Sequence, residues 1–309
     1  MTRVWLPDPP EAFGGIPDGL RADVWKGGEQ LPGSAADVEF VVMPFGVAAQ
    51  RAGHVLNGLP SLKVVQLMSA GADHVLPYLP PGVTLCNARG AHTPATAEWT
   101  VGAIIAALRQ FPRFAVAQHE GRWDSGQSES VFGKHVLIVG YGSIGEAVER
   151  RLAGWEVTVE RVARTARPAA DGPAVLGLED LATALPRADV VVILVPTTDD
   201  TRNMVDVKFL AAMKDGALLV NAARGVIVDT DALLNELNTK RIKAALDVTA
   251  PEPLPAGHPL WSVPGLLLTP HVGGAVRAGR ERAYQIVAAQ LARYAAGQPL
   301  AHVIGERGY

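Results

Sequence analysis

The stretch VLIVGYGSIG, residues 136–145, decides the fold of this chain. An apolar run ends in the pattern G-x-G-x-x-G, and Ala147, Val148 and Leu152 continue at helical spacing. In a strand–turn–helix unit, the first glycine permits a tight turn and the second lets a pyrophosphate approach the backbone. The third lets the helix pack closely on the strand, and N–H groups at the helix N-terminus bind the phosphates. Glycine-rich loops are also ordinary turns, but this position between strand and helix predicts a dinucleotide-binding domain.

Length and composition set the broad class of the protein. The 309 residues suffice for two domains, and 48% hydrophobic with 19% charged residues is an ordinary globular composition. A net charge of -3 without a Lys/Arg-rich run predicts neither nucleic acid nor a membrane surface as partner. The single cysteine, Cys86, excludes an internal disulfide. The N-terminus lacks a signal-peptide core and the apolar runs are too short to span a bilayer, so we expect a cytoplasmic protein.

Two series of short apolar runs alternate with polar or helical stretches, as strands alternate with helices in α/β proteins. The runs of the second series are β-branched and almost wholly apolar, which is typical of strands covered on both faces. The sequence therefore predicts an α/β protein with two doubly wound parallel sheets. The expected strands are Arg3–Leu6, Val38–Met43, Lys63–Met68 and Val83–Asn87 in the first series, and Val136–Gly140, Val157–Val162, Val190–Val195, Ala217–Asn221, Ala244–Val248 and Leu266–Thr269 in the second.

The domain boundary is expected near residues 88–135. Thr93-Pro94 suits a helix N-cap followed by Pro in the first turn. Residues 123–133 are rich in Ser, Gly and charge, as a linker or surface loop would be, and a second long helix is expected over 277–294. If that helix crosses back to the first half, a Rossmann domain is inserted into a flavodoxin-like substrate domain, with the active site in the cleft. The expected domains are residues 1–92 with 276–309 for the substrate and residues 93–275 for the dinucleotide.

Three further segments place charged residues at or beyond the carboxyl end of a predicted strand. They are NAARGVIVD (221–229), DVTAPEPLP (247–255) and LTPHVGG (268–274). Open α/β sheets bind ligands at this edge. Taken singly, an Arg after a strand is usually a surface charge, a His after Pro a turn residue, and a Glu between prolines a solvated loop residue. Their occurrence together, each at a strand end, indicates a reaction site.

With these motifs, the chain resembles the D-isomer-specific 2-hydroxyacid dehydrogenase family. The resemblance runs over nearly the whole chain, from SAGAD (69–73) to His271. It implies hydride transfer between a nicotinamide cofactor and a small 2-keto or 2-hydroxy acid. By the family pattern Arg224 binds the substrate, and Glu252 with His271 forms the acid/base pair. The substrate contacts that the resemblance implies are Ser69, Ala70, Gly71, Arg224 and His271.

The chemistry of such a reduction explains these residue types. A 2-keto acid needs a hydride at its carbonyl carbon, a proton for the carbonyl oxygen and a cation for its carboxylate. The planar guanidinium of Arg224 suits the carboxylate, and His271 donates a proton near neutral pH. Glu252 would accept a hydrogen bond from the other ring nitrogen and fix the orientation of the imidazole.

The family pattern also places the cofactor contacts, with Asp247 at the nicotinamide end. The expected cofactor-binding residues are Gly140, Gly142, Ser143, Ile144, Gly145, Ala163, Arg164, Thr165, Val195, Pro196, Ala222, Ala223, Arg224, Asp247, His271, Gly273 and Gly274.

The end of the second strand of the dinucleotide domain bears on the choice of cofactor. NAD-binding folds place an acidic residue there, where it binds the ribose 2′-hydroxyl. In this chain the position falls on Ala163, followed by Arg164 and Arg167, and Glu160 lies three positions earlier inside the strand. A carboxylate that would repel a 2′-phosphate is missing, so we expect NADP(H) to be preferred. The alternative is that Arg164 stacks on adenine and NAD(H) serves as well.

The identity of the substrate stays open at this stage. Glyoxylate and hydroxypyruvate are the expected keto acids, because NADPH-preferring relatives commonly reduce them. The same fold also serves formate and phosphite dehydrogenases and nicotinamide-sensing corepressors, which are the alternatives. The resemblance implies a homodimer formed partly by residues 93–118. No metal is expected, since no His/Cys/Asp/Glu cluster has the spacing of metal ligands.

Overall fold

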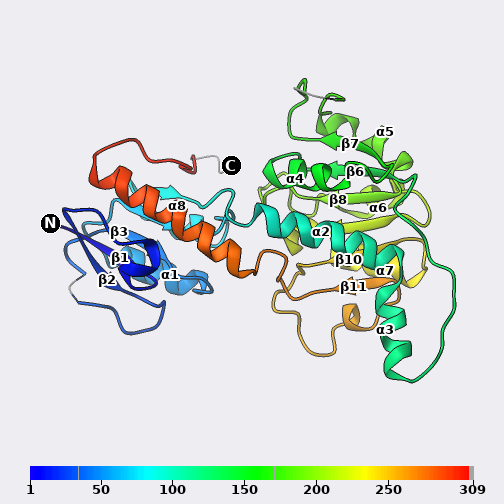
Figure 1. Cartoon of the computed structure of the whole chain (residues 1–309), viewed down its shortest axis with the longest axis horizontal. Helices are drawn as coiled ribbons and strands as arrows, with labels where there is room; N and C mark the ends of the chain where they lie inside the picture. The colour runs from blue at the N-terminus through cyan, green and yellow to red at the C-terminus, as the bar shows by residue number, and fades with distance from the viewer. Residues whose placement is uncertain (34, 170–171, 306–309) are drawn as a thin grey trace. The chain divides into compact units, whose positions relative to one another are not determined.

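The computed structural model describes residues 1–33, 35–169 and 172–305. The chain forms two compact units (Figure 1), Met1–His92 with Ala275–Tyr309, and Thr93–Gly274. We call them the first and the second unit. Each is an all-parallel sheet covered by helices, so the predicted fold class is confirmed.

The sheet of the first unit has the strand order β2-β1-β3-β4-β5, which is the flavodoxin-like order. The edge strand β2 was not predicted, because only Leu20 of its five residues is buried and two others are charged. An edge strand that is partly exposed to solvent does not need the apolar composition of a central strand. The strands are β1 (Thr2–Leu6), β2 (Leu20–Val24), β3 (Val38–Met43), β4 (Val64–Leu67) and β5 (Thr84–Cys86).

Helices α1 (Ala49–Asn57) and α8 (Arg277–Ala295) cover the two faces of this sheet. Successive side chains of a strand point to opposite faces. Trp5 accordingly lies in the cluster with α1, and Val4 lies in the cluster with α8. Figure 1 shows α8 lying along the sheet, so the predicted C-terminal helix completes the core of the N-terminal residues.

The sheet of the second unit has the order β11-β10-β9-β8-β6-β7. Beyond β7, Leu176 pairs with Val162 in an isolated parallel bridge. Counting this segment as a third strand gives the order 3-2-1-4-5-6 of the dinucleotide-binding fold, continued by one further strand. The strands are β6 (His135–Val139), β7 (Thr158–Val162), β8 (Val190–Ile193), β9 (Leu218–Asn221), β10 (Lys243–Leu246) and β11 (Leu266–Leu268).

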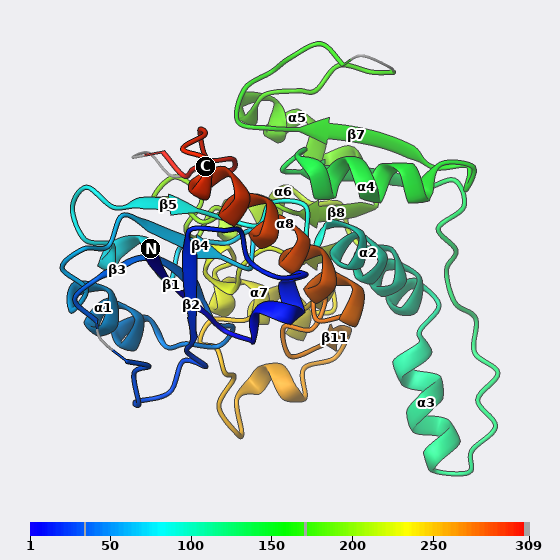
Figure 2. The ribbon, with the colours of Figure 1, turned by 60° about the vertical axis from the view of Figure 1, so that its left-hand side comes forward.

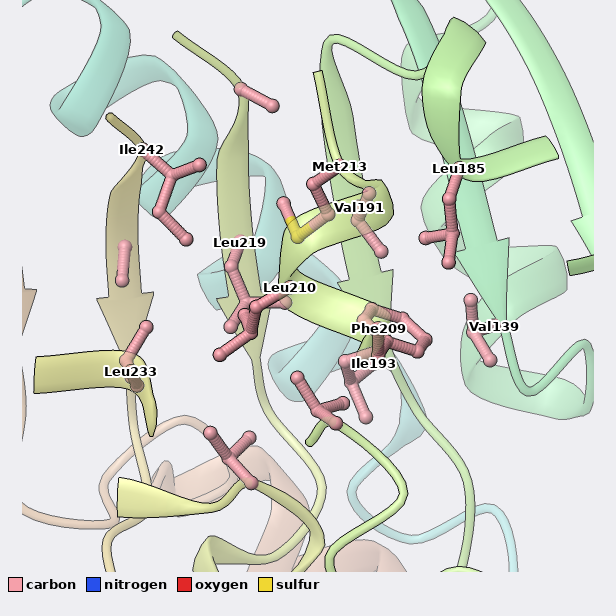
Figure 3. Close-up of a cluster of buried hydrophobic side chains, with 14 of the residues drawn as sticks. Val139, Leu185, Val191, Ile193, Phe209, Leu210, Met213, Leu219, Leu233 and Ile242 are labelled. Atoms are coloured by element: carbon pink, nitrogen blue, oxygen red, sulfur yellow. The ribbon is translucent and has the colours of Figure 1, made fainter. Parts of the chain in front are cut away.

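Two hydrophobic clusters fill the second unit, one on each face of its sheet. Helices α2 (Thr93–Leu108) and α4 (Ser143–Leu152) contribute to one cluster, and α6 (Val207–Ala212) and α7 (Thr230–Asn238) to the other. Figure 3 shows Leu210 and Met213 lying over the strand residues of the second cluster. The shorter elements are α5 (Leu181–Ala184), η1 (Pro10–Phe13), η2 (Leu76–Tyr78), η3 (Leu178–Asp180), η4 (Leu185–Arg187), η5 (Gly225–Ile227) and η6 (Pro259–Trp261).

Helix α3 (Phe111–His119) was not predicted. It extends away from the sheet of its unit, and the following segment returns to that sheet at β6 (Figure 2). Arg113 joins the helix to the segment through Asp124, with Nη2 2.6 Å from Oδ1, and Arg122 adds a second ion pair to the same carboxylate. Only Ala117 of this helix is buried, so the helix lacks the apolar periodicity by which a sequence reveals a core helix.

Candidate active site

The glycine-rich loop between β6 and α4 has three glycines in three different environments. Gly140 has a φ of +105°, and a Cβ there would lie 2.5 Å from the carbonyl carbon of Leu194. At Gly142 a Cβ would meet no atom within 4 Å. At Gly145 it would lie 3.0 Å from the carbonyl oxygen of Gly140 and 3.1 Å from Cγ2 of Ile138. The loop therefore makes its turn at Gly140 and its helix contact at Gly145, and the open space at Gly142 fits a pyrophosphate at the N-terminus of α4.

No carboxylate stands directly after β7. Ala163 is buried, and its N–H donates to the carbonyl oxygen of Leu176 at 3.0 Å. Arg167 reaches back to the glycine-rich loop, where its Nη2 donates to the carbonyl oxygen of Tyr141 at 2.6 Å. The carboxylate of Glu160 pairs instead with His135 and Arg187, 3.0 Å and 2.6 Å away. Arg167 is therefore the charged side chain that reaches the loop from the segment after β7, and Glu160 is engaged with His135 and Arg187.

A buried ion pair supports the same loop, and the sequence analysis missed it. Arg161 of β7 is 8% exposed and donates from Nε to Glu149 Oε2 at 2.8 Å, while its Nη1 donates to the carbonyl oxygen of Pro173 at 2.7 Å. The hydroxyl group of Tyr141 donates a hydrogen bond to the Glu149 carboxylate, and the centre of the Tyr141 ring lies 5.1 Å from the guanidinium carbon of Arg161. Burial, and then the carboxylate of Glu149, raise the pKa of Tyr141 to about 12. The adjacent charged residues Glu160 and Arg161 inside a predicted strand were the signal for this network.

The three strand-end segments lie side by side, because β9, β10 and β11 are neighbours in the sheet. Leu246 at the end of β10 is opposite Asn221 of β9 and Leu268 of β11. After β9, a Cβ at Gly225 would lie 1.9 Å from the carbonyl oxygen of Thr249, so only glycine permits this approach. The segment that contains Arg224 thus lies directly against the chain that leads to Glu252.

His271 and Glu252 form a close pair at this edge. The distance from His271 Nδ1 to Glu252 Oε1 is 2.5 Å. An ionised carboxylate only accepts hydrogen bonds, so Nδ1 is the donor and Nε2 is turned away from Glu252. The side chains of His271 and Glu252 are 45% and 40% exposed, so the pair is open to a reacting molecule. This is the arrangement that an orienting carboxylate and an acid/base imidazole require.

Asp247 holds the turn that presents His271. Its carboxylate is buried and accepts from Thr269 Oγ1 at 2.6 Å, from Val272 N at 2.9 Å and from Gly273 N at 2.8 Å. The carbonyl oxygen of Asp247 accepts from His271 N at 2.7 Å, and His271 has a φ of +55°. Asp247 therefore maintains an uncommon backbone conformation at His271, and its contact with a nicotinamide stays a prediction.

The other predicted site residues follow strand ends as well. Ala222 and Ala223 follow β9, and Asn221 Oδ1 accepts from Ala223 N at 3.0 Å. Val195 and Pro196 follow the end of β8. The turn at residues 69–71 follows β4 in the first unit.

The described part of the chain contains no group of three or more His, Cys, Asp or Glu side chains that could hold a metal. Within the same residues, no helix is both long and apolar enough to cross a membrane.

A parallel α/β sheet with a glycine-rich loop and a His–Glu pair at its carboxyl edge is typical of nicotinamide-dependent dehydrogenases. The family model described as "D-isomer specific 2-hydroxyacid dehydrogenase, NAD binding domain" matches residues 101–273, more than half of the chain. The chain therefore belongs to the D-isomer-specific 2-hydroxyacid dehydrogenase family.

Individual relatives agree with this placement. A glyoxylate reductase of Thermofilum pendens is 34% identical over 253 residues, which cover 77% of this chain and 73% of the relative. Among solved structures, a D-isomer specific 2-hydroxyacid dehydrogenase of Xanthobacter autotrophicus Py2 in complex with NADPH and MES has a TM-score of 0.83 and 27% identity, covering 100% of this chain and 99% of the other. An NADPH-dependent glyoxylate/hydroxypyruvate reductase of Sinorhizobium meliloti in complex with NADP and sulfate has a TM-score of 0.84 and 26% identity, covering 100% of both chains.

Proposed function

We propose that this protein reduces a small 2-keto acid, such as glyoxylate or hydroxypyruvate, to the D-2-hydroxy acid with NADPH. The observation that carries the proposal is the His271–Glu252 pair at the carboxyl edge of the sheet formed by β9, β10 and β11. The segment that contains Arg224 follows β9 at the same edge. The glyoxylate reductases among the relatives support the choice of substrate.

Each residue has a defined task in this reaction. A nicotinamide cofactor, when bound at the glycine-rich loop, would supply the hydride for this reduction. Arg224 binds the carboxylate and polarises the carbonyl group. His271 gives the proton on Nε2 to the carbonyl oxygen, while Glu252 holds the Nδ1 proton and stabilises the imidazolium before transfer. Backbone N–H groups of the turn at residues 69–71 bind the substrate carboxylate.

A panel of 2-keto acids assayed with NADPH and with NADH tests this function. We expect turnover of glyoxylate or hydroxypyruvate, with a higher kcat/KM for NADPH. Binding of NADPH without turnover of any keto acid would favour a nicotinamide sensor. Oxidation of formate or phosphite, without reduction of any keto acid, would favour the other dehydrogenases of this fold.

The preference for NADPH rests on the strand end at Ala163. We predict that Ala163→Asp shifts the ratio of kcat/KM for NADPH over NADH by about 10- to 100-fold toward NADH. A carboxylate at this position accepts from a ribose 2′-hydroxyl and repels a 2′-phosphate. The matched control is Glu160→Gln, which removes the nearest native acid and should leave the ratio unchanged. A wild-type preference for NADH would contradict the proposal directly.

We further propose that two copies of the chain associate through residues 93–118. Phe111 and Val116 of α3 are 52% and 55% exposed, and Trp123 on the following segment is 95% exposed, which supports an apolar contact surface. We expect Phe111→Glu to convert a dimer into a monomer in sedimentation velocity. Val207→Glu, at a 61% exposed position on α6, is the control that should leave the mass unchanged. A wild-type monomer at micromolar concentration would refute this assignment.

A further inference from the structure

The turn after β4 has an unusual pattern of hydrogen bonds. The four successive carbonyl oxygens of residues 68–71 each accept a hydrogen bond, and three of the four donors belong to the segment 87–92. A carbonyl oxygen only accepts, so Nε2 of His92 is the donor in its pair. The pairs are His92 Nε2 to Met68 O at 3.1 Å, Ala88 N to Ser69 O at 2.9 Å, Asn87 Nδ2 to Ala70 O at 2.7 Å and Ser69 Oγ to Gly71 O at 3.0 Å.

These contacts determine where the N–H groups of the turn point. In a planar trans peptide, the C=O of one residue and the N–H of the next point in opposite directions. The donor from Asn87 on the Ala70 carbonyl therefore turns the N–H of Gly71 away from Asn87. His92 and Ala88 orient the N–H groups of Ser69 and Ala70 in the same way. Because these three carbonyls point toward the segment 87–92, the N–H groups of Ser69, Ala70 and Gly71 point away from it, where they suit an anion.

We infer that Asn87 is a positioning residue for the substrate carboxylate, which it orients through the Ala70–Gly71 peptide. The inference rests on the proposed function, in which this turn binds that carboxylate. Among the three donors, Asn87 alone contributes a side-chain amide that is itself buried, with 3% exposure. Its Oδ1 accepts from Arg89 N at 3.1 Å while its Nδ2 donates to Ala70 O, and its backbone N–H donates to the carbonyl oxygen of His302 at 3.1 Å. Both polar atoms of the Asn87 side-chain amide are therefore hydrogen-bonded, which fixes the direction of Nδ2.

Two substitutions separate this positioning role from a general effect on folding. Asn87→Ser keeps an oxygen that accepts from Arg89 N, as serine does in such turns, but it is too short to reach the Ala70 carbonyl. We expect KM for glyoxylate to rise about tenfold, with a smaller change in kcat and an unchanged Kd for NADPH. Asn87→Asp keeps the oxygen that accepts from Arg89 N, but it replaces the Nδ2 donor with a second carboxylate oxygen. Two acceptors then face each other at the Ala70 carbonyl and repel, so KM should rise by about a hundredfold.

The matched control is Asn57→Asp in the same unit. Asn57 is the last residue of α1, and its Nδ2 donates to the carbonyl oxygen of Gly53 at 2.8 Å and to that of Tyr78 at 3.3 Å. This variant makes the same change from amide to carboxylate, and neither carbonyl belongs to the turn or to the segment 87–92. Its KM should therefore stay near the wild-type value even if its Tm falls.

The outcomes of this experiment distinguish the two proposals. If the wild-type protein reduces no 2-keto acid, the proposed function fails and the positioning role falls with it. If the wild type is active but Asn87→Ser and Asn87→Asp keep a KM within twofold of it, only the positioning role is overturned. An equal rise of KM in Asn57→Asp would also overturn it, because the effect would then reflect stability alone.

Discussion

Replacing His271 with alanine should lower kcat for keto-acid reduction by about 10²–10⁴, the usual contribution of a positioned acid/base group. The hydride acceptor develops negative charge on its oxygen, and without the imidazole only water can protonate it. Affinity for NADPH should fall far less than kcat, since the glycine-rich loop, which is expected to bind the phosphates, lies at the ends of other strands. Stopped-flow or steady-state assays with glyoxylate measure the loss, and fluorescence titration measures the affinity.

Two companion variants sharpen this result. Glu252→Gln keeps an oxygen that accepts from Nδ1 but removes the charge that stabilises the imidazolium, so its loss should be smaller than that of His271→Ala. His258→Asn is the control, because His258 lies on the same connection between β10 and β11 and only caps η6. A His271→Ala enzyme with near wild-type kcat would refute the acid/base role.

The Arg224→Ala variant should lose about 10²–10³ in kcat/KM for the keto acid. The loss should appear in both KM and kcat, because the guanidinium binds the carboxylate in the ground state and stabilises the charge on the carbonyl oxygen in the transition state. Arg224→Lys keeps the charge without the planar fork, so we expect only partial recovery.

The structure supplies a control for the arginine as well. Arg187 pairs with Glu160 at 2.6 Å with its side chain 51% exposed. Arg187→Ala should leave kcat/KM within about twofold of wild type, as exposed ion pairs contribute little. If Arg224→Ala reduced keto acids at the wild-type rate, the carboxylate would have to be bound elsewhere, and the proposed site would be wrong.

Local sequence patterns predicted most of the fold because burial leaves a strong signal in central elements. The central parallel strands are covered on both faces, and their apolar runs gave element positions within one or two residues, as in β8 at Val190–Ile193. The edge strand β2 and the helix α3 were missed because weak burial leaves no such signal. Few of their residues are buried, so their sequences carry no apolar period.

The sequence by itself determined the parallel α/β architecture, the three distinct environments of the glycines from Gly140 to Gly145, and the positions of Arg224, Glu252 and His271 after strands. Each of these follows from a few consecutive residues and the chain geometry that they permit. Only the tertiary structure decided which side chains meet. The order of β9, β10 and β11 brings the three segments together, Arg161 pairs with Glu149 from another element, and Asn87 reaches the carbonyl of Ala70. Such contacts join residues distant in the chain, and a hydrogen bond depends on separations of a few tenths of an ångström that sequence patterns do not encode.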